Sequence, residues 1–171
     1  MLIILYLIST LYHALTPYHV KKVFGVFDHS SIYLLISGTY TPFCLGVLRQ
    51  HGGWYLFGII WSLTILGITF YAIFGSKMRL LSVITYVIMG WLICLYWKPL
   101  KANVPAATIT FLLAGGIVYT LGVIAYALKK IKWAHCIWHL FVLGGSILHF
   151  FSVFSIIPFC TVFPFDTSVR I

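Results

Sequence analysis

Residues 134–151 read AHCIWHLFVLGGSILHFF, an apolar run that begins with two histidines four residues apart. On an α-helix, residues i and i+4 lie on one face, one turn apart, so His135 and His139 can direct imidazole nitrogens at the same point. Ionisable side chains inside a membrane segment are costly and by default indicate a functional site with partners elsewhere. The stretch therefore predicts a transmembrane helix that supplies one half of a polar site.

The composition of the chain places it among integral membrane proteins. Of its 171 residues, 62% are hydrophobic and only 8% are charged, whereas an average soluble domain has about 25% charged residues. A helix needs about 20 apolar residues to cross a bilayer. Six apolar segments follow one another along the chain, at residues 1–15, 28–48, 54–74, 80–97, 105–128 and 135–157.

These segments predict an all-α fold, a polytopic transmembrane helix bundle with six helices. The breaks between the segments are short, so we expect sequential helices to be antiparallel neighbours. We interpret residues 1–157 as a single transmembrane domain and residues 158–171 as a short C-terminal tail. The first segment, at about 1.5 Å per residue, is shorter than a hydrocarbon core of about 30 Å. Either the chain begins partway through a helix or this helix is unusually short.

The net charge of +9 reflects membrane topology rather than nucleic-acid binding, because the basic residues fall in the breaks between apolar segments. Alternate breaks place seven cations on one side of the membrane: Lys21, Lys22, Lys77, Arg79, Lys129, Lys130 and Lys132. The other side receives Arg49, Lys98, Lys101 and Arg170. The excess predicts that the first side is cytoplasmic. We expect a multi-pass integral membrane protein with no nucleic-acid partner.

The same counting of breaks brings five polar residues to the cytoplasmic end of the bundle. Ser9 and His13 are one helical turn apart near the end of the first segment, Asp28 begins the second, and His135 and His139 begin the last. Three imidazoles suit Zn²⁺, and three protein ligands leave a coordination position open, as catalytic zinc sites do. The pattern predicts His13, His135 and His139 as zinc ligands.

Simpler roles exist for each of these residues. The histidine pair could form interhelical hydrogen bonds without a metal. Asp28 is suited to act as a base or to orient a water molecule, but it could equally be the N-cap of its helix. Ser9 is suited to hydrogen-bond near the metal, or it could be a packing serine. His149 lies ten residues beyond His139, about 15 Å along the axis, too far for the same metal, and we interpret it as a hydrogen-bonded histidine of the bundle.

Three stretches closely resemble bacterial hemolysin III proteins: LISTLYH (residues 7–13), FDHSSIYLLISGTYTP (27–42) and HCIWHLFVLGGSILHF (135–150). These proteins belong with the progestin and adipoQ receptor family and, more loosely, with alkaline ceramidases. The resemblance implies a seven-helix fold with an intramembrane zinc site near the cytoplasmic face, held at His13, His135 and His139, with Ser9 and Asp28 near the zinc-bound water. This chain departs from the family by lacking its first helix and by an unusual tail.

Three functions follow as hypotheses. The first is a zinc-dependent, ceramidase-like hydrolase of lipid amides or esters, in which Asp28 and Ser9 are the catalytic residues and a membrane lipid is the substrate. The second is a non-enzymatic, receptor-like or membrane-homeostasis protein in which zinc is structural. The third, suggested by the family's name, is a cytolysin or pore former, and the long apolar helices argue against a soluble toxin that inserts later.

Overall fold

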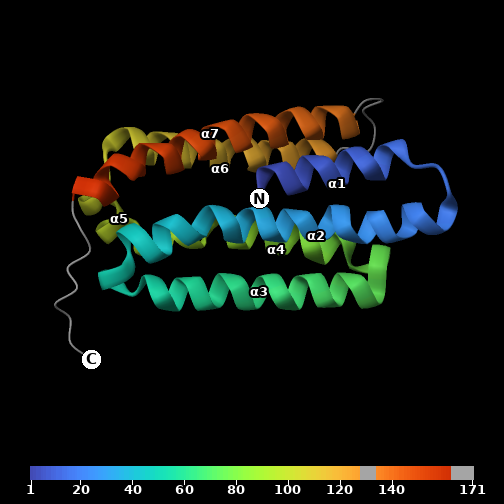
Figure 1. Cartoon of the computed structure of the whole chain (residues 1–171), viewed down its shortest axis with the longest axis horizontal. Helices are drawn as coiled ribbons and strands as arrows, with labels where there is room; N and C mark the ends of the chain where they lie inside the picture. Colours follow the sequence, from blue (N-terminus) through green and yellow to red (C-terminus); the bar gives the residue numbers. More distant parts are fainter. Residues whose placement is uncertain (128–133, 163–171) are drawn as a thin grey trace. The chain divides into compact units, whose positions relative to one another are not determined.

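The computed structural model of the chain describes residues 1–127 and 134–162, and this part is helical without a strand (Figure 1). Contacts divide the chain into two compact units. Unit 1 comprises Met1–Leu45 and Gly52–Ile93, and unit 2 comprises Gly46–His51 and Cys94–Ile171. Residues 128–133 lie outside the described part, and with them Lys129, Lys130 and Lys132.

Unit 1 is built on four α-helices, which are α1 (Leu2–Ala14), α2 (Tyr18–Pro42), α3 (Gly53–Phe74) and α4 (Arg79–Trp91). α2 packs against α1, α3 and α4 (Figure 1). The π-helical turn η1 (Phe43–Val47) follows Pro42, and the 3₁₀ turn η3 (Gly75–Met78) joins α3 to α4. α2 and α4 therefore begin at the same end of the unit, and α3 ends there.

The face of α2 that meets α3 and α4 is a stripe of small polar residues and tyrosines at helical spacing: Ser30, Tyr33, Ser37 and Tyr40, all buried. The Tyr33 ring lies so close to α3 that a Cβ atom at Gly67 would be 2.3 Å from it. One turn further, the hydroxyl groups of Ser37 and Thr64 hydrogen-bond to each other. Close approach at a small residue and interhelical hydrogen bonds are what hold helices together where lipid removes the hydrophobic driving force.

Tyr40 marks the place where α4 gives way to the 3₁₀ turn η4 (Leu92–Tyr96). Its hydroxyl donates toward the carbonyl oxygens of Met89 and Gly90, at 2.7 and 2.9 Å, and accepts from the Ile93 N–H at 2.9 Å. A change from α to 3₁₀ hydrogen bonding disturbs the backbone pairing locally. Tyr40 supplies partners for these buried backbone groups, which would otherwise be costly inside a membrane.

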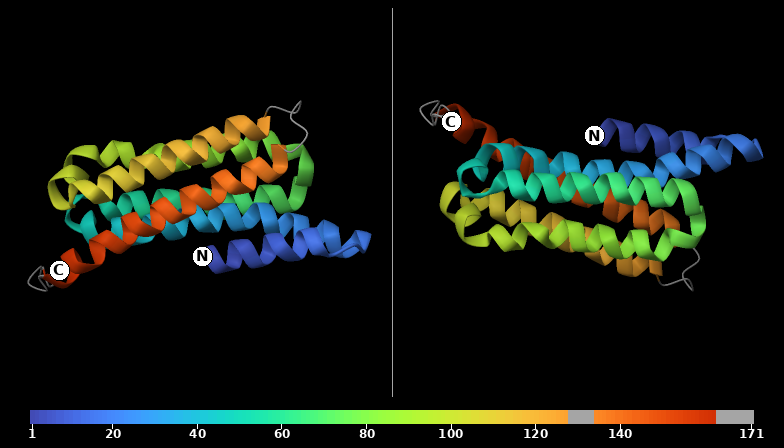
Figure 2. Two further views of the ribbon diagram at one scale, coloured as in Figure 1. Left: turned by 90° about the horizontal axis from the view of Figure 1, so that it is seen from above. Right: turned by 90° about the horizontal axis from the view of Figure 1, so that it is seen from below.

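Unit 2 contains the short helix α5 (Trp97–Asn103) and an antiparallel hairpin of α6 (Ala106–Ala127) and α7 (Ala134–Val162), which lie side by side (Figure 2). Near the start of α6, the Ser152 hydroxyl donates to the Thr108 carbonyl at 2.8 Å. Further along, glycines allow close approach: a Cβ atom at Gly115 would lie 2.0 Å from the His149 ring, and one at Gly145 would lie 2.9 Å from the Tyr119 ring. The small size of these glycines therefore lets α6 and α7 pack closely.

The described helices confirm the predicted all-α membrane fold. Four of them are long and apolar enough to cross a membrane: Gly53–Phe74, Arg79–Asn103, Ala106–Tyr126 and Cys136–Ile157. The last two begin within a residue of the predicted positions 105 and 135, and α1 is short, as predicted. α7 continues to Val162, five residues beyond the predicted end at 157.

The start of α2 differs from the prediction. The apolar pattern suggested a helix from Asp28, but α2 begins at Tyr18, ten residues earlier, directly after Pro17. Proline is favoured where a helix starts because its missing N–H has no partner there, and polarity between residues 18 and 27 did not prevent helix formation. Asp28 therefore lies inside the helix, and its proposed role as an N-cap is wrong.

Candidate functional site

Two close contacts set the register of the α1–α2 hairpin. A Cβ atom at Gly38 would lie 2.4 Å from the Met1 side chain, and a Cβ atom at Gly25 would lie 3.2 Å from the Tyr12 ring. Tyr12 is therefore level with Gly25, and the two helices run in opposite directions. Counting three residues back in α1 and three residues on in α2 places Ser9 level with Asp28. The structure thus places at one level of the hairpin the serine and the aspartate that the sequence singled out.

Ser9 and His13 share a row on α1, as their spacing predicted. Leu5 and Ser9 are the two buried residues of this helix, at i and i+4, and His13 is the next residue in that row. Ser9 is only 8% exposed, whereas His13 is exposed and its ring meets Tyr12 edge-on, 4.9 Å between centroids. A buried hydroxyl and an accessible imidazole therefore lie one turn apart in this part of unit 1.

Asp28 is half-buried. It lies in a segment of α2 whose backbone carbonyls accept hydrogen bonds from neighbouring side chains. Ser31 donates to the Asp28 backbone carbonyl at 2.7 Å, and Tyr86 of α4 donates to the backbone carbonyl of His29 at 2.8 Å. On the other side of the segment, the His29 ring stacks on Tyr71 of α3 with centroids 4.5 Å apart.

These contacts also account for two residues outside the predicted site. His29 donates through Nδ1 to the Gly25 carbonyl at 3.1 Å and stacks on Tyr71, so its ring has a structural role within unit 1. Tyr86, in contrast, was missed. A tyrosine inside an apolar segment is a weak signal, and only the structure shows that its hydroxyl reaches the residue next to Asp28.

The histidine pair lies on α7, in unit 2. The helix is continuous from Ala134 to Val162, so His135 and His139 are one turn apart, as predicted. His139 is half-buried, one residue beyond Trp138, whose ring lies 5.6 Å from that of Tyr126. The side chain of His135 lies outside the described part of the chain.

The three predicted zinc ligands are thus divided between the units, with His13 in unit 1 and the other two in unit 2. Among the residues that the structure describes, no three or more His, Cys, Asp or Glu side chains form a group that could hold a metal ion. The zinc site therefore stays a prediction. The arrangement within unit 1, where Ser9 is level with Asp28 and His13 is one turn from Ser9, is the part that the structure describes.

His149 has a different place, as its spacing from His139 indicated. Its Nε2 donates to the Leu112 carbonyl at 3.2 Å, and the ring occupies the space that Gly115 leaves open. The Tyr119 ring meets the His149 ring edge-on, with centroids 5.2 Å apart. The hydroxyl groups of Tyr119 and Ser146 form a hydrogen bond of 2.8 Å. The interpretation of His149 as a hydrogen-bonded histidine of the bundle is confirmed.

Comparison with known proteins finds a family model and several relatives of the same hemolysin III type. The family described as "Haemolysin-III related" matches residues 1–150. The chain is 49% identical over 156 residues to "Hemolysin-3" of Bacillus cereus, and the match covers 91% of this chain and 71% of that protein. It is 46% identical over 164 residues to "Hemolysin-3 homolog" of Bacillus subtilis, and that match covers 96% of this chain and 76% of the relative. It is 27% identical over 161 residues to human "Monocyte to macrophage differentiation factor", covering 88% and 65%.

No solved structure matches the chain. The two Bacillus relatives and the four apolar helices identify it as a multi-pass integral membrane protein of the bacterial plasma membrane. A family match over residues 1–150, together with nearly half of the residues identical to those of two hemolysins, is far above chance resemblance. The chain therefore belongs to the hemolysin III family.

Proposed function

We propose that this protein is a zinc-dependent hydrolase of lipid amides or esters, with His13, His135 and His139 as metal ligands and Asp28 and Ser9 as catalytic residues. The observation that supports the proposal most strongly is the register of the α1–α2 hairpin, which places Ser9 level with Asp28 and one turn from His13. A carboxylate, a hydroxyl group and an imidazole are thus close to one level of unit 1, in a chain with only two acidic residues.

The chemistry of the donor set suits zinc. Three neutral imidazole nitrogens are a known ligand set for catalytic zinc, and they leave one position for water or substrate. His135 and His139 would contribute two of them from a single face of α7, because they are one turn apart. His13 would contribute the third from α1. A carboxylate that is not a ligand is then available for proton transfer.

Zinc in such a site supplies Lewis acidity toward a carbonyl oxygen. The Asp28 carboxylate would take a proton from the attacking water and return it to the departing amine or alcohol, so that one water is consumed for each amide or ester bond broken. Ser9 would hold the carboxylate in orientation by donating its hydroxyl hydrogen. The Tyr86 contact to His29 would keep this segment of α2 at a fixed depth.

The bilayer favours a lipid as the substrate. The proposed residues lie on helices of a membrane protein, and a lipid reaches such a site by lateral diffusion with its acyl chain remaining in the hydrocarbon region. Amide and ester bonds join headgroup and chains near the polar–apolar boundary of the bilayer, at the depth where the predicted site lies. The proposal therefore commits to lipid amides or esters.

The test measures bound zinc and turnover on the same preparations of detergent-solubilised protein. We expect about one zinc per chain in the wild type, its loss in His139→Ala and its retention in His149→Ala, because His149 bonds to Leu112 instead. Asp28→Asn should keep zinc and lose hydrolysis of a fluorescent N-acylsphingosine or diacylglycerol probe. A folded wild type without zinc would overturn the metal site, and unchanged turnover in Asp28→Asn would overturn the catalytic role.

A second candidate function comes from the names of the Bacillus relatives, which are called hemolysins. Membrane lysis by this protein would appear as dye release from vesicles that contain it. Such release should be independent of Asp28, because a pore needs no general base. Equal leakage from wild-type and Asp28→Asn vesicles, above that of empty vesicles, would favour lysis over hydrolysis.

A further inference from the structure

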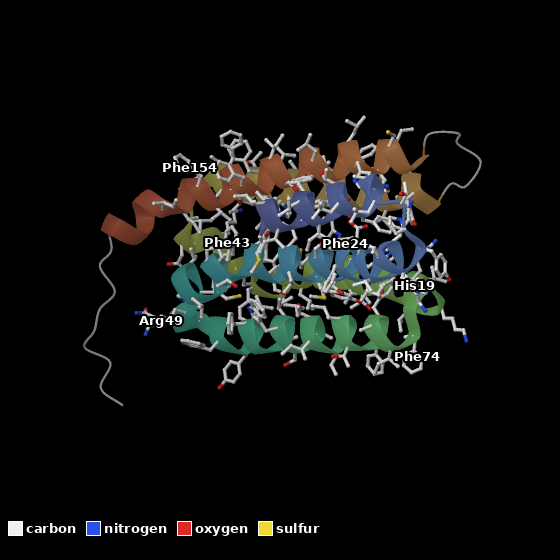
Figure 3. The ribbon with its side chains drawn as sticks, turned by 45° about the vertical axis from the view of Figure 1, so that its right-hand side comes forward. His19, Phe24, Phe43, Arg49, Phe74 and Phe154 are labelled. Carbon is white, nitrogen blue, oxygen red and sulfur yellow. The ribbon has the colours of Figure 1, made fainter. Side chains whose placement is uncertain are left out.

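We propose that one end of unit 1 binds the headgroups of anionic phospholipids, independently of the zinc site. This basic end consists of four cationic side chains, all exposed: Lys21, Lys22, Lys77 and Arg79. It lies where α2 begins and where the turn η3 joins α3 to α4. In Figure 3 the labelled His19 and Phe74 mark this end of the unit, and Phe43 marks the opposite end.

The hydrogen bond between Tyr86 and His29 fixes the relative height of two of these cations. Lys22 precedes His29 by seven residues in α2, and Arg79 precedes Tyr86 by seven residues in α4. The two helices run in the same direction, so both cations lie about 10 Å beyond that bond. Lys22 and Arg79 therefore lie at about the same height on neighbouring helices, where the headgroups of one lipid layer can reach both.

The charges of the basic end are placed where a helix least favours them. α2 has Lys21 in its first turn, and α4 begins with Arg79. The N-terminus of a helix carries partial positive charge and unpaired N–H groups, so a cation there is destabilising and an anion is stabilising. Neither helix has an acidic residue in its first turn or a hydrogen bond from its N-cap side chain. The charges and the helix ends thus repel one another in the protein alone.

The described part of the chain contains a single carboxylate side chain, Asp28. The whole chain has eleven Lys and Arg residues but only two acids, Asp28 and Asp166. Asp28 lies six residues beyond Lys22, about 9 Å deeper along α2, and Asp166 lies outside the described part of the chain. An anion from the surroundings can supply the compensating negative charge.

A phospholipid headgroup fits this requirement better than a soluble anion. The ends of membrane-spanning helices lie at headgroup depth, where anionic lipids attract clusters of Lys and Arg. A lipid phosphate can accept from uncapped backbone N–H groups at a helix N-terminus and from the neighbouring cations. Two side chains at this end have the character of interfacial residues: Lys21 Nζ lies 5.7 Å from the centre of the Tyr12 ring, and Tyr18 is 76% exposed. Tyrosine is enriched at this depth in membrane proteins.

The experiment compares thermal unfolding of the full chain in vesicles of phosphatidylcholine alone and in vesicles that also contain phosphatidylglycerol. We expect phosphatidylglycerol to raise the unfolding midpoint of the wild type. The variant Lys22→Gln/Arg79→Gln should unfold at a higher temperature than the wild type in phosphatidylcholine, because repulsion among the clustered cations and between Arg79 and the N-terminus of α4 is relieved. The same variant should gain little from phosphatidylglycerol.

Two further variants make the result specific. Lys98→Gln/Lys101→Gln removes two exposed charges from α5 in unit 2 and should keep the full response to phosphatidylglycerol. Lys22→Arg/Arg79→Lys keeps the charges and should also keep the response, which excludes an effect of packing alone. Inorganic phosphate at the same bulk concentration should not replace the lipid. An equal response in Lys22→Gln/Arg79→Gln and wild type, or an equal effect of inorganic phosphate, would overturn the proposal.

Discussion

Tyr86 of α4 donates its hydroxyl hydrogen to the backbone carbonyl of His29, the residue after Asp28 in α2, at 2.8 Å. The Tyr86 ring also meets Tyr33 edge-on, with centroids 4.5 Å apart. One side chain thus combines a polar contact to the segment of the proposed site with apolar packing between two helices. The two contributions can be separated by removing only the hydroxyl.

Tyr86→Phe should therefore destabilise the protein modestly while the ring packing remains. Loss of one intramolecular hydrogen bond costs about 0.5–1.5 kcal/mol, and interhelical bonds in membranes fall in the same range. The measurement is the midpoint of unfolding in detergent. Tyr55→Phe is the matched control, because Tyr55 is 77% exposed on α3 and should have no effect. Equal midpoints for Tyr86→Phe and wild type would show that the bond adds no stability.

Tyr40→Phe should cost more than Tyr86→Phe, about 1–3 kcal/mol, because buried backbone groups at the end of α4 lose their partner. Faster backbone amide exchange at Ile93, whose N–H donates to the Tyr40 hydroxyl, should accompany the loss. Hydrogen exchange followed by mass spectrometry would detect it. Protection at Ile93 that does not change in Tyr40→Phe would contradict this account of the turn η4.

Gly115→Ala should destabilise the α6–α7 hairpin, because the added methyl group would lie 2.0 Å from the His149 ring. Overpacking of this kind costs about 1–3 kcal/mol. Gly58→Ala in α3 is the control, since nothing lies within 4 Å of its Cβ position, and there the higher helix propensity of alanine should stabilise slightly. If both substitutions shifted the unfolding midpoint in the same direction, the close contact would not be the cause.

Removal of zinc by a chelator should lower the unfolding midpoint of the wild type, because a ligand that binds only the folded state stabilises it. His139→Ala should unfold at the same temperature with and without the chelator. His149→Ala should start from a lower midpoint, since its bond to Leu112 is lost, and should still respond to the chelator. A wild type that is insensitive to chelation under conditions that strip zinc would exclude a stabilising metal.

The sequence predicted the helices well wherever apolar length alone determines them. α3, α6 and the start of α7 agree with the predicted segments within one residue, because the bilayer requires long apolar runs. α2 begins ten residues before its predicted start, since hydropathy does not register a helix that extends beyond the apolar region through Lys21 and Lys22. Its true start depends on Pro17, a local signal that hydropathy ignores.

The site was predictable only in part. The i and i+4 spacing correctly placed Ser9 in one row with His13, and His139 in one row with His135. That Ser9 is level with Asp28 depends on the register of two helices, which is set by the contacts at Gly25 and Gly38. Spacing within one helix contains no information about such contacts. Tyr86 was missed for the same reason, because its role arises from packing between α4 and α2.

Each of the two close contacts between α6 and α7 joins a glycine of one helix to a ring of the other. Gly115 of α6 faces His149 of α7, and Gly145 of α7 faces Tyr119 of α6. Neither position of a pair can change its size alone without a clash or a cavity. Family members with a side chain at the position of Gly115 should therefore have a smaller residue than histidine at that of His149, and the same exchange should link Gly145 with Tyr119. Correlated substitution at these two pairs would record the register of the hairpin in the evolution of the family.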